Sequence, residues 1–528
     1  MNYKKFLCTW LSLIIVISFA TGLFNMLVDP YDVWRLYRRV GVNMCSVRED
    51  WMDRTVKPLH LSGFNTDTQI LFLGNSKMQF GMDVDFYQHQ KGKITFNGAV
   101  KAASLYEQRR FLEHALKVAP RIEEVVMQLD YIMFIEGQFF SLPRTQLDFD
   151  EKLLDSSSIT PRKVAEILFS ADAIRDGVHT IRENQREKYT FRLYDDSGTA
   201  TDEYISYFHR SSNLFFSTNA QRYLRDGWLH HVNINEDAFI ELGRVKDICS
   251  QHGIKIIFFI APTYANLMMQ NLMSWDVYSE WMRRMVGVVP VLDFSDINEF
   301  TDSEIKSCDT NNANRYFWDM VHMRKNIGEK IQRKLLDESV EPGFGVWVDQ
   351  ENVESHLQDL REKMDAWGEQ HPYEIDDMKY FIGFSADEPV ALSNKNWQTS
   401  RDCIRLDLPG GAELPDFNLL PRTQLSVRGL YYNKGFDKIK IYAMLTAMNG
   451  KRYFALTSHE YSQDLADYMR NKAYAYNAFL LGGSISNVDS GDYELCFLEL
   501  FSDGKVYLTD TVAKVHVASD NGASYGKE

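Results

Sequence analysis

Strand and helix patterns alternate along the chain from residue 69 onward, and this alternation restricts the possible folds more than any other feature. Continuous apolar runs predict strands at 69–74, 93–96, 124–129, 256–260 and 288–294. Apolar residues at helical spacing predict helices at 103–118, 237–252 and 326–336. Strands that alternate with helices are typical of a parallel sheet covered by helices, so we expect an α/β domain over residues 29–340.

Other parts of the chain depart from this alternation. A polar and aromatic stretch at about 137–235 predicts an insertion within the α/β domain. Charged, helix-forming residues predict a helical linker at 341–371. From 372 to 528, short alternating runs separated by turn signals predict an antiparallel β-sandwich domain, beginning with a strand at 380–384.

The N-terminal segment 6–28 carries no charged side chain. A helix of this length can cross a hydrocarbon core of about 30 Å, so we predict an uncleaved membrane anchor over 1–28. The alternative is a cleaved signal peptide, which the length of the run and the lack of a clean small-x-small site disfavour. The positive charges of the lysines before the run and of the arginines after it nearly balance, so they do not by themselves set the orientation of the helix in the membrane. The short N-terminal tail is most simply left in the cytoplasm, which places the rest on the extracytoplasmic, periplasmic side.

Charge and cysteine content exclude several classes of partner and site. The chain has 58 basic and 73 acidic residues, a formal charge of −15, and lacks the basic surface that nucleic-acid binding requires. Its six cysteines form no C-x-x-C motif, so a structural zinc site is not indicated, although one or two disulfides remain possible. The adjacent pair His230-His231 points its side chains apart and is a poor metal site. We expect neither a metal ion nor an organic cofactor.

A serine follows the first predicted strand directly, in Leu73-Gly74-Asn75-Ser76. Open α/β sheets place their sites at the carboxyl ends of their strands, so Ser76 is a candidate nucleophile. The alternative is an ordinary strand-to-helix turn with Ser76 as its N-cap. Residues 260–264 leave a central strand at the same edge, and either line an acceptor site or only form the strand exit.

An acid and a histidine lie three residues apart just before the last predicted helix, as Asp319 and His322. This spacing places a carboxylate and an imidazole on one side of a helical turn. A carboxylate beside an imidazole orients it and stabilises its cationic form, as a general base requires. The alternative is a surface pair near the start of a helix.

These residues stand in stretches that resemble the SGNH (GDSL-like) hydrolase superfamily, and in particular the membrane-anchored bacterial proteins of exopolysaccharide O-acetylation, such as those acting on alginate. The resemblance covers about residues 29–335. The matching stretches are Asp29-Pro30-Tyr31, 71–83, 96–107, 125–134, 256–264 and 316–322. It implies a flavodoxin-type sheet with helices on both faces. It also implies Ser76 as the nucleophile and the Asp319–His322 pair as its base.

The resemblance implies an O-acyltransferase or esterase that adds or removes acyl groups on a cell-surface or exported polysaccharide. Its partners would be the polysaccharide, an acyl donor or acyl-donating membrane protein, and the cytoplasmic membrane through residues 6–28. The rival interpretation is a non-catalytic glycan-binding or assembly protein of polysaccharide export with a degenerate SGNH fold.

The same resemblance raises a question about the oxyanion hole. The superfamily builds it from the serine N–H, a glycine N–H and an asparagine side chain, which is expected near residues 128–131. That stretch reads Gln-Leu-Asp-Tyr, and the carboxylate of Asp130 would repel an oxyanion. We therefore predict an oxyanion hole from Ser76 and Asn97, which ends the second strand. The alternative is that Asn97 only caps its turn.

Overall fold

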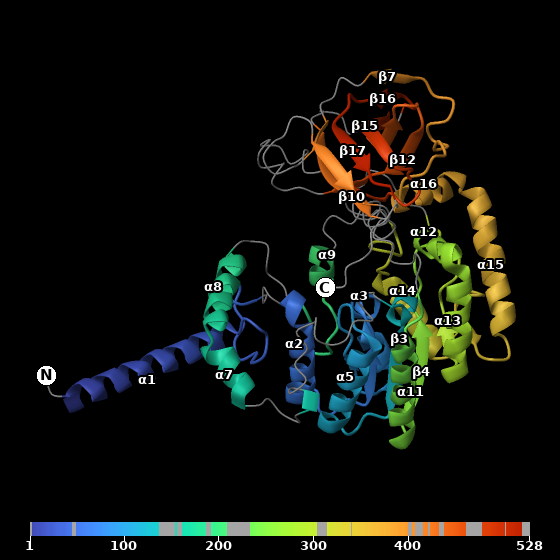
Figure 1. The fold of residues 1–528 in the computed structure, drawn as a ribbon. Coiled ribbons are helices and arrows are strands. Elements are labelled where there is room, and N and C mark those ends of the chain that lie inside the picture. Colours follow the sequence, from blue (N-terminus) through green and yellow to red (C-terminus); the bar gives the residue numbers. More distant parts are fainter. Residues whose placement is uncertain are drawn as a thin grey trace.

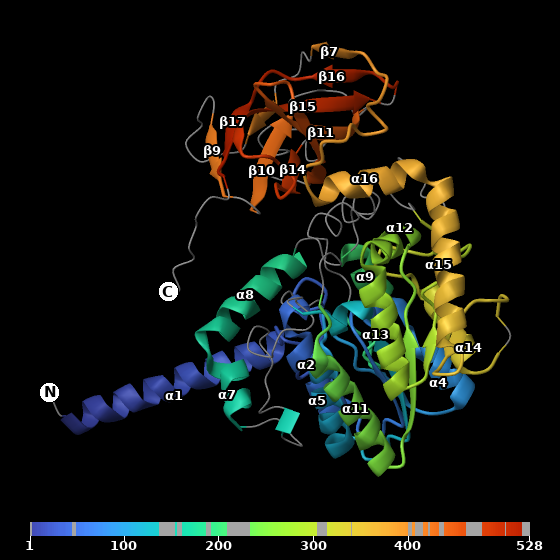
Figure 2. The same cartoon turned by 45° about the vertical axis from the view of Figure 1, so that its right-hand side comes forward.

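The computed structural model describes residues 3–44, 49–136, 154–155, 161–185, 192–208, 233–303, 314–338, 340–399, 404–406, 415–420, 423–431, 438–460, 478–501 and 503–519. A long helix projects from an α/β domain, and a β-rich domain stands on the other side of two connecting helices (Figures 1 and 2).

A six-stranded sheet forms the centre of the α/β domain, in the order β2-β1-β3-β4-β5-β6. The first five strands are parallel, and β6 is antiparallel to β5. Their bounds are β1 Ile70–Leu73, β2 Thr95–Asn97, β3 Glu124–Leu129, β4 Lys255–Ile260, β5 Val291–Asp293 and β6 Val346–Val348. The parallel order 2-1-3-4-5 is that of doubly wound sheets. The predicted parallel sheet is confirmed, and β6 extends it into the segment predicted as linker.

Helices cover both faces of this sheet because alternate residues of its buried strands face opposite sides. In β1, Ile70 and Phe72 join one apolar cluster, whereas Leu71 and Leu73 join another. The first cluster includes residues of α3 (Ser76–Gly81), α4 (Val84–Lys91) and α14 (Lys325–Leu335). The second includes residues of α5 (Leu105–Val118), α11 (Glu236–Gln251) and α13 (Trp275–Val288). Shorter or peripheral elements of this domain are α2 (Glu49–Phe64), η1 (Tyr131–Phe134), α9 (Asp202–Phe208), α12 (Ala265–Met268) and η4 (Met269–Ser274).

Two helices, α15 (Val353–Gln370) and α16 (Pro372–Ile382), connect the domains. The predicted strand at 380–384 is therefore wrong, because most of it belongs to α16. Pro372 suits the first turn of a helix, and Met378 and Phe381, three residues apart, are both buried. One apolar cluster runs from the α/β domain through both helices into the C-terminal domain, which joins them in one packed body.

The C-terminal domain contains a four-stranded sheet, β13-β14-β10-β8, and a seven-stranded one built on β12-β11-β15-β16-β7 with β17 and β9. Apolar residues of both sheets share one cluster. Most pairs are antiparallel, as predicted, but β16–β7 and β17–β9 are parallel. The strands are β7 Trp397–Thr399, β8 Ile404–Leu406, β9 Asp416–Leu419, β10 Gln424–Tyr431, β11 Lys438–Ala447, β12 Arg452–Leu456, β13 Ser458–Glu460, β14 Ala478–Ser484, β15 Gly491–Phe501, β16 Val506–Leu508 and β17 Ala513–Val517.

The N-terminal helix α1 (Tyr3–Val28) is long and apolar enough to cross a membrane. Its side chains are exposed over most of its length, and only its last turns are buried, against α7 (Pro161–Phe169) and α8 (Ala171–Gln185). These two helices belong to the predicted insertion, most of which lies outside the described residues, as does His230-His231. Among the described cysteines, Cys8, Cys249 and Cys496 are free thiols.

Candidate active site

Ser76 begins helix α3 at the carboxyl end of β1, three residues after Leu73. Gly74 makes the turn between them possible, because a Cβ there would lie 2.7 Å from the Met78 Cβ and 2.8 Å from the Gln128 Oε1. The N-cap of α3 is Asn75, whose side chain accepts from the Lys77 N–H at 2.9 Å. The alternative in which Ser76 itself caps the helix is therefore wrong, and its hydroxyl is available for other contacts.

Asp319 and His322 lie in a loop before α14 and not in the helical turn that their spacing predicts. The Asp319 Oδ1 accepts from the backbone N–H groups of Val321 and His322, at 2.8 and 2.7 Å. These bonds fold the loop back so that the carboxylate still meets the imidazole. An isolated bridge between Phe317 and Met323 closes the loop.

The three side chains form a continuous chain of hydrogen bonds. The His322 Nε2 is 2.9 Å from the Ser76 Oγ, and its Nδ1 is 2.7 Å from the Asp319 Oδ2. Asp319 and His322 are 2% and 8% exposed. A carboxylate is an acceptor only, so the Nδ1 carries the ring proton and the Nε2 is left to accept from the serine hydroxyl. This arrangement can take a proton from Ser76 while Asp319 stabilises the resulting imidazolium.

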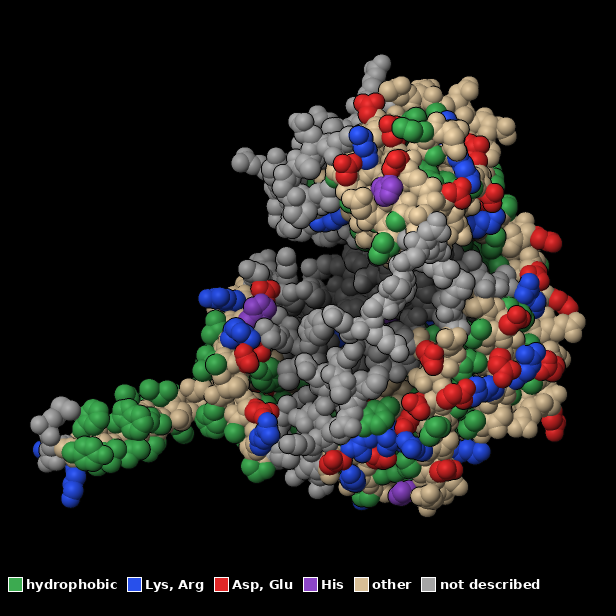
Figure 3. Space-filling model, in the orientation of Figure 1, with side chains coloured by type: hydrophobic (Ala, Val, Ile, Leu, Met, Phe, Trp, Pro, Cys, Tyr) green, Lys and Arg blue, Asp and Glu red, His purple; other side chains and the backbone are tan. Residues whose placement is uncertain are grey.

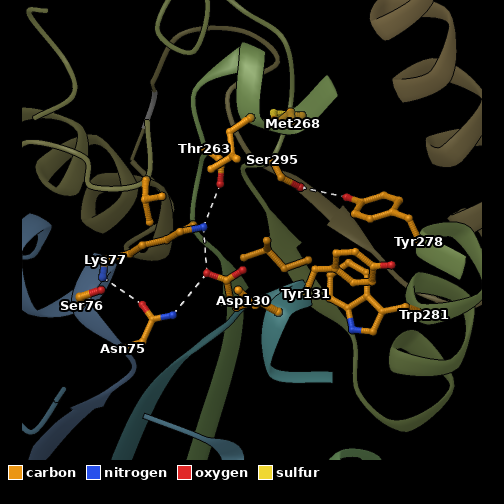
Figure 4. A pocket seen from close by; sticks show the side chains of 15 residues that line it. Asn75, Ser76, Lys77, Asp130, Tyr131, Thr263, Met268, Tyr278, Trp281 and Ser295 are labelled. Carbon is orange, nitrogen blue, oxygen red and sulfur yellow. Dashed lines mark hydrogen bonds and ion pairs between the residues drawn. The ribbon is translucent and has the colours of Figure 1, made fainter. Parts of the chain in front are cut away.

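A cavity of about 90 Å³ opens beside Ser76 (Figure 4). Its wall is mainly apolar and comes from the ends of β1, β3 and β4 and from α12 and α13. The lining residues are Asn75, Ser76, Lys77, Asp130, Tyr131, Ile132, Ile260, Ala261, Thr263, Leu267, Met268, Tyr278, Trp281, Ser295 and Val321. Three members of the segment 260–264 are among them, so this strand exit does line the space next to the serine.

The carboxylate of Asp130 reaches this cavity but does not stand alone. The Lys77 Nζ lies 2.8 Å from the Asp130 Oδ2 and also donates to the Thr263 Oγ1 at 2.8 Å. Both charged side chains are largely buried. The ammonium group offsets the negative potential that Asp130 would otherwise impose on a reacting carbonyl.

Asn97 lies inside the protein and away from the cavity lining. Its Nδ2 donates to the Met82 carbonyl at 3.2 Å, and its Oδ1 accepts from the Ala99 N–H at 3.1 Å. This placement corresponds to the turn-capping alternative and corrects the predicted oxyanion role, because the Oδ1 is used in the turn after β2 and the Nδ2 is used at the end of α3.

Asn75 is a cavity residue that the sequence-based prediction missed. Its Oδ1 faces the helix as a cap, which turns its Nδ2 toward the cavity, 3.3 Å from the Asp130 Oδ2 (Figure 4). The position directly before the candidate nucleophile, together with the N-cap preference of asparagine, was the signal that could have identified it.

A second buried aspartate–histidine pair lies in the same domain, between Asp293 of β5 and His356 of α15. The His356 Nε2 is 2.8 Å from the Asp293 Oδ2. Burial lowers the pKa of His356, but the hydrogen bond and charge of Asp293 outweigh it, and the pKa is raised overall. The nearby Ser295 hydroxyl donates to Asp293 and not to the histidine. This pair therefore lacks the serine-to-imidazole bond that His322 makes.

Comparison with protein-family models finds no match, and comparison with curated protein sequences finds none either.

Proposed function

We propose that the protein is a serine O-acyltransferase or esterase, acting through Ser76, His322 and Asp319 on acyl groups of a cell-surface or exported polysaccharide. The observation that carries this proposal is the hydrogen-bonded chain from the Ser76 Oγ through His322 to Asp319, at the edge of an apolar cavity. The resemblance of the surrounding stretches to SGNH hydrolases of exopolysaccharide O-acetylation supports the choice of substrate.

The chemistry follows from the direction of these hydrogen bonds. The His322 Nε2 accepts the Ser76 proton as the Oγ bonds to the acyl carbonyl carbon. When the tetrahedral intermediate collapses, the bond to the donor oxygen or sulfur breaks and His322 returns the proton to that leaving group. A sugar hydroxyl, or water in an esterase, then loses its proton to His322 and attacks the acyl-enzyme. Collapse of the second intermediate releases the product and restores the Ser76 hydroxyl.

An oxyanion needs hydrogen-bond donors beside the nucleophile, and we place two there. The Ser76 N–H belongs to the first turn of α3, whose amides have no acceptor within the helix. The Asn75 Nδ2 faces the same cavity. Lys77 neutralises Asp130 nearby, so the carboxylate at the position expected for asparagine is compatible with catalysis.

The cavity suits the acyl part of a substrate better than the sugar part. Its lining is mainly apolar, and its volume of about 90 Å³ is smaller than the roughly 150 Å³ of an engineered cavity that admits benzene. A short acyl chain such as acetyl fits such a space, whereas a sugar would bind outside it.

The proposed setting is the outer side of the cytoplasmic membrane. Helix α1 would hold the α/β domain beside the exported polymer, and an acyl donor or acyl-donating membrane protein would supply the acyl group. The two C-terminal sheets would form a β-sandwich accessory module. The second candidate function is that of a non-catalytic glycan-binding protein. The absence of an asparagine at 128–131, where the resemblance places an oxyanion-hole residue, favours it.

Fluorophosphonate labelling of the full chain separates these two functions, because the probe reacts covalently with an activated serine. We expect one label on the wild-type protein, on the peptide that carries Ser76. Ser76→Ala should take up none, and His322→Gln should label much more slowly. His356→Gln is the matched control, since it disrupts an aspartate–histidine pair without a serine on the imidazole, and should label as the wild type does. A folded wild-type protein that takes up no label would favour the binding function.

A further inference from the structure

Helices α7 and α8, joined through Ser170, follow one another across the last turns of α1, and we call them the α7–α8 pair (Figures 1 and 2). The Phe169 ring, at the end of α7, lies against Gly22, where an added Cβ would be 2.7 Å from a ring carbon. The Phe24 ring is equally close to Gly177 of α8. The glycines let the helices approach closely, so the α7–α8 pair is in firm contact with the base of α1.

Polar contacts also hold the α7–α8 pair against the base of α1. The Asn25 Nδ2 of α1 donates to the Leu168 carbonyl of α7 at 2.8 Å. The hydroxyl of Tyr31, just after α1, donates to the Asp176 Oδ2 of α8 at 2.9 Å, and both residues are buried. The α7–α8 pair and the base of α1 are therefore one structural unit.

The side of α8 that faces the protein is made of small and polar residues: Ala173, Asp176, Gly177, Thr180 and Asn184. Its exposed side mixes the apolar Ile174 and Val178 with charged side chains such as Asp172 and Arg175. Phe169 of α7, Ile174 and Val178, which we call the α7–α8 patch, are 50%, 40% and 37% exposed. These large apolar side chains therefore lie outside the protein, where they can contact another apolar phase.

The length of α1 places the α7–α8 patch at the membrane. A hydrocarbon core of about 30 Å takes about 20 helical residues at 1.5 Å each. Counted from Phe6, where the uncharged run begins, this span reaches Asn25. Phe169 contacts Gly22, three residues and about 4.5 Å inside that end. The junction of α7 and α8 thus lies at the level where α1 leaves the hydrocarbon.

We propose that the α7–α8 pair is a second membrane contact, in which Phe169, Ile174 and Val178 insert between lipid acyl chains of the leaflet on the side of the α/β domain. Beside the base of α1, apolar side chains are exposed on this pair among charged ones (Figure 3). Four of the charged side chains close to the patch form ion pairs, Arg162 with Glu166 at 2.9 Å and Arg175 with Asp172 at 2.7 Å. Insertion therefore depends on apolar burial and not on lipid charge. With α1 alone the domain could rotate about a single helix, whereas two contacts fix its orientation.

Photo-crosslinking of the full chain in nanodiscs of zwitterionic phospholipid tests this proposal. Benzoylphenylalanine is placed at Phe169 or Ile174, with Leu13 of α1 as the positive control. Tyr373 of α16, 55% exposed and on the far side of the domain from α1, is the negative control (Figure 1). We expect lipid adducts at Phe169, Ile174 and Leu13, and none at Tyr373.

Lipid adducts at Leu13 but not at Phe169 or Ile174 would overturn the proposal, as would adducts to a second copy of the chain in place of lipid. Radical footprinting of the unaltered chain in the same nanodiscs guards against a folding defect in the variants. It should protect Phe169 and Ile174 and leave Tyr373 oxidised. Neither measurement depends on catalysis, so failure here is distinguishable from failure of the proposed acyl transfer.

Discussion

Replacing Asn75 by serine separates two functions that its side chain combines. The Oδ1 caps α3 by accepting from the Lys77 N–H, and the Nδ2 faces the cavity beside Ser76. Serine is as good an N-cap as asparagine, so Asn75→Ser keeps the cap. It removes the amide donor that we assign to the oxyanion.

The two functions differ in the size of their effects. Loss of one oxyanion-hole donor lowers turnover by about a hundred- to a thousandfold, or roughly 3–4 kcal/mol of barrier. Exchange of one good N-cap for another changes stability by a few tenths of a kcal/mol, on the order of the difference between such residues. For Asn75→Ser we therefore expect a large fall in kcat, a nearly constant KM and a nearly constant melting temperature.

The assay is hydrolysis of p-nitrophenyl acetate, with a melting curve on each variant. Asn97→Ala is the matched control, because it removes another buried amide from the same sheet edge. Its hydrogen bonds to Met82 and Ala99 are buried and away from the cavity, so the variant should lose about 1–3 kcal/mol of stability and keep its turnover. Normal turnover in Asn75→Ser would refute the reasoning, and so would a hundredfold loss in a stable Asn97→Ala protein.

Further variants test the charges around the site. Asp319→Asn should lower kcat by on the order of ten-thousandfold while binding persists, because it favours the wrong imidazole tautomer. The stabilising contribution of the Asp293–His356 pair should be fully present below the unfolded histidine pKa near 6.5 and lost as pH rises through the raised folded pKa. Melting curves of the wild type and His356→Gln should therefore converge with rising pH, and a constant difference would contradict this. Lys77→Met should cost up to about 3–5 kcal/mol by leaving the largely buried Asp130 carboxylate without its cation, and a second change, Asp130→Asn, should restore much of it. Denaturant unfolding measures the stability of the single and the double variant, and an equal loss of stability in the two would exclude this explanation.

The sheet was predictable because its strands are buried on both faces. The run that became β3 is apolar at four of its six positions and buried at all six, and its predicted bounds agree with the structure. Strand β6 was missed because it is only three residues long and two of them are exposed. The strand predicted at 380–384 failed because neighbouring buried aromatic residues in a short run fit either a strand or a helix.

The candidate site was predictable in its residue types and order, but not in its backbone. Asp319 and His322 meet through backbone hydrogen bonds that fold a loop, a conformation that spacing alone does not distinguish from a helical turn. Asn97 is the last residue of β2 and Asn75 follows β1, and the two strands end at the same edge. Only the rotation of each side chain decides which amide faces the cavity. The Met82 carbonyl holds the amide of Asn97 away from it, whereas capping of α3 turns the amide of Asn75 toward it. The pairing of Lys77 with Asp130 joins two elements and carries no local sequence signal.

Trapping the acyl-enzyme tests the central claim most directly. The wild-type chain is mixed with an activated acetyl ester, quenched in acid during the first turnover, and digested for mass spectrometry. Acyl transfer through Ser76 predicts one added acetyl group, on the peptide that carries Ser76. It also predicts loss of that group on delayed quenching and its absence from Ser76→Ala. An acetyl group on a different peptide, or ester turnover that persists in Ser76→Ala, would contradict the account.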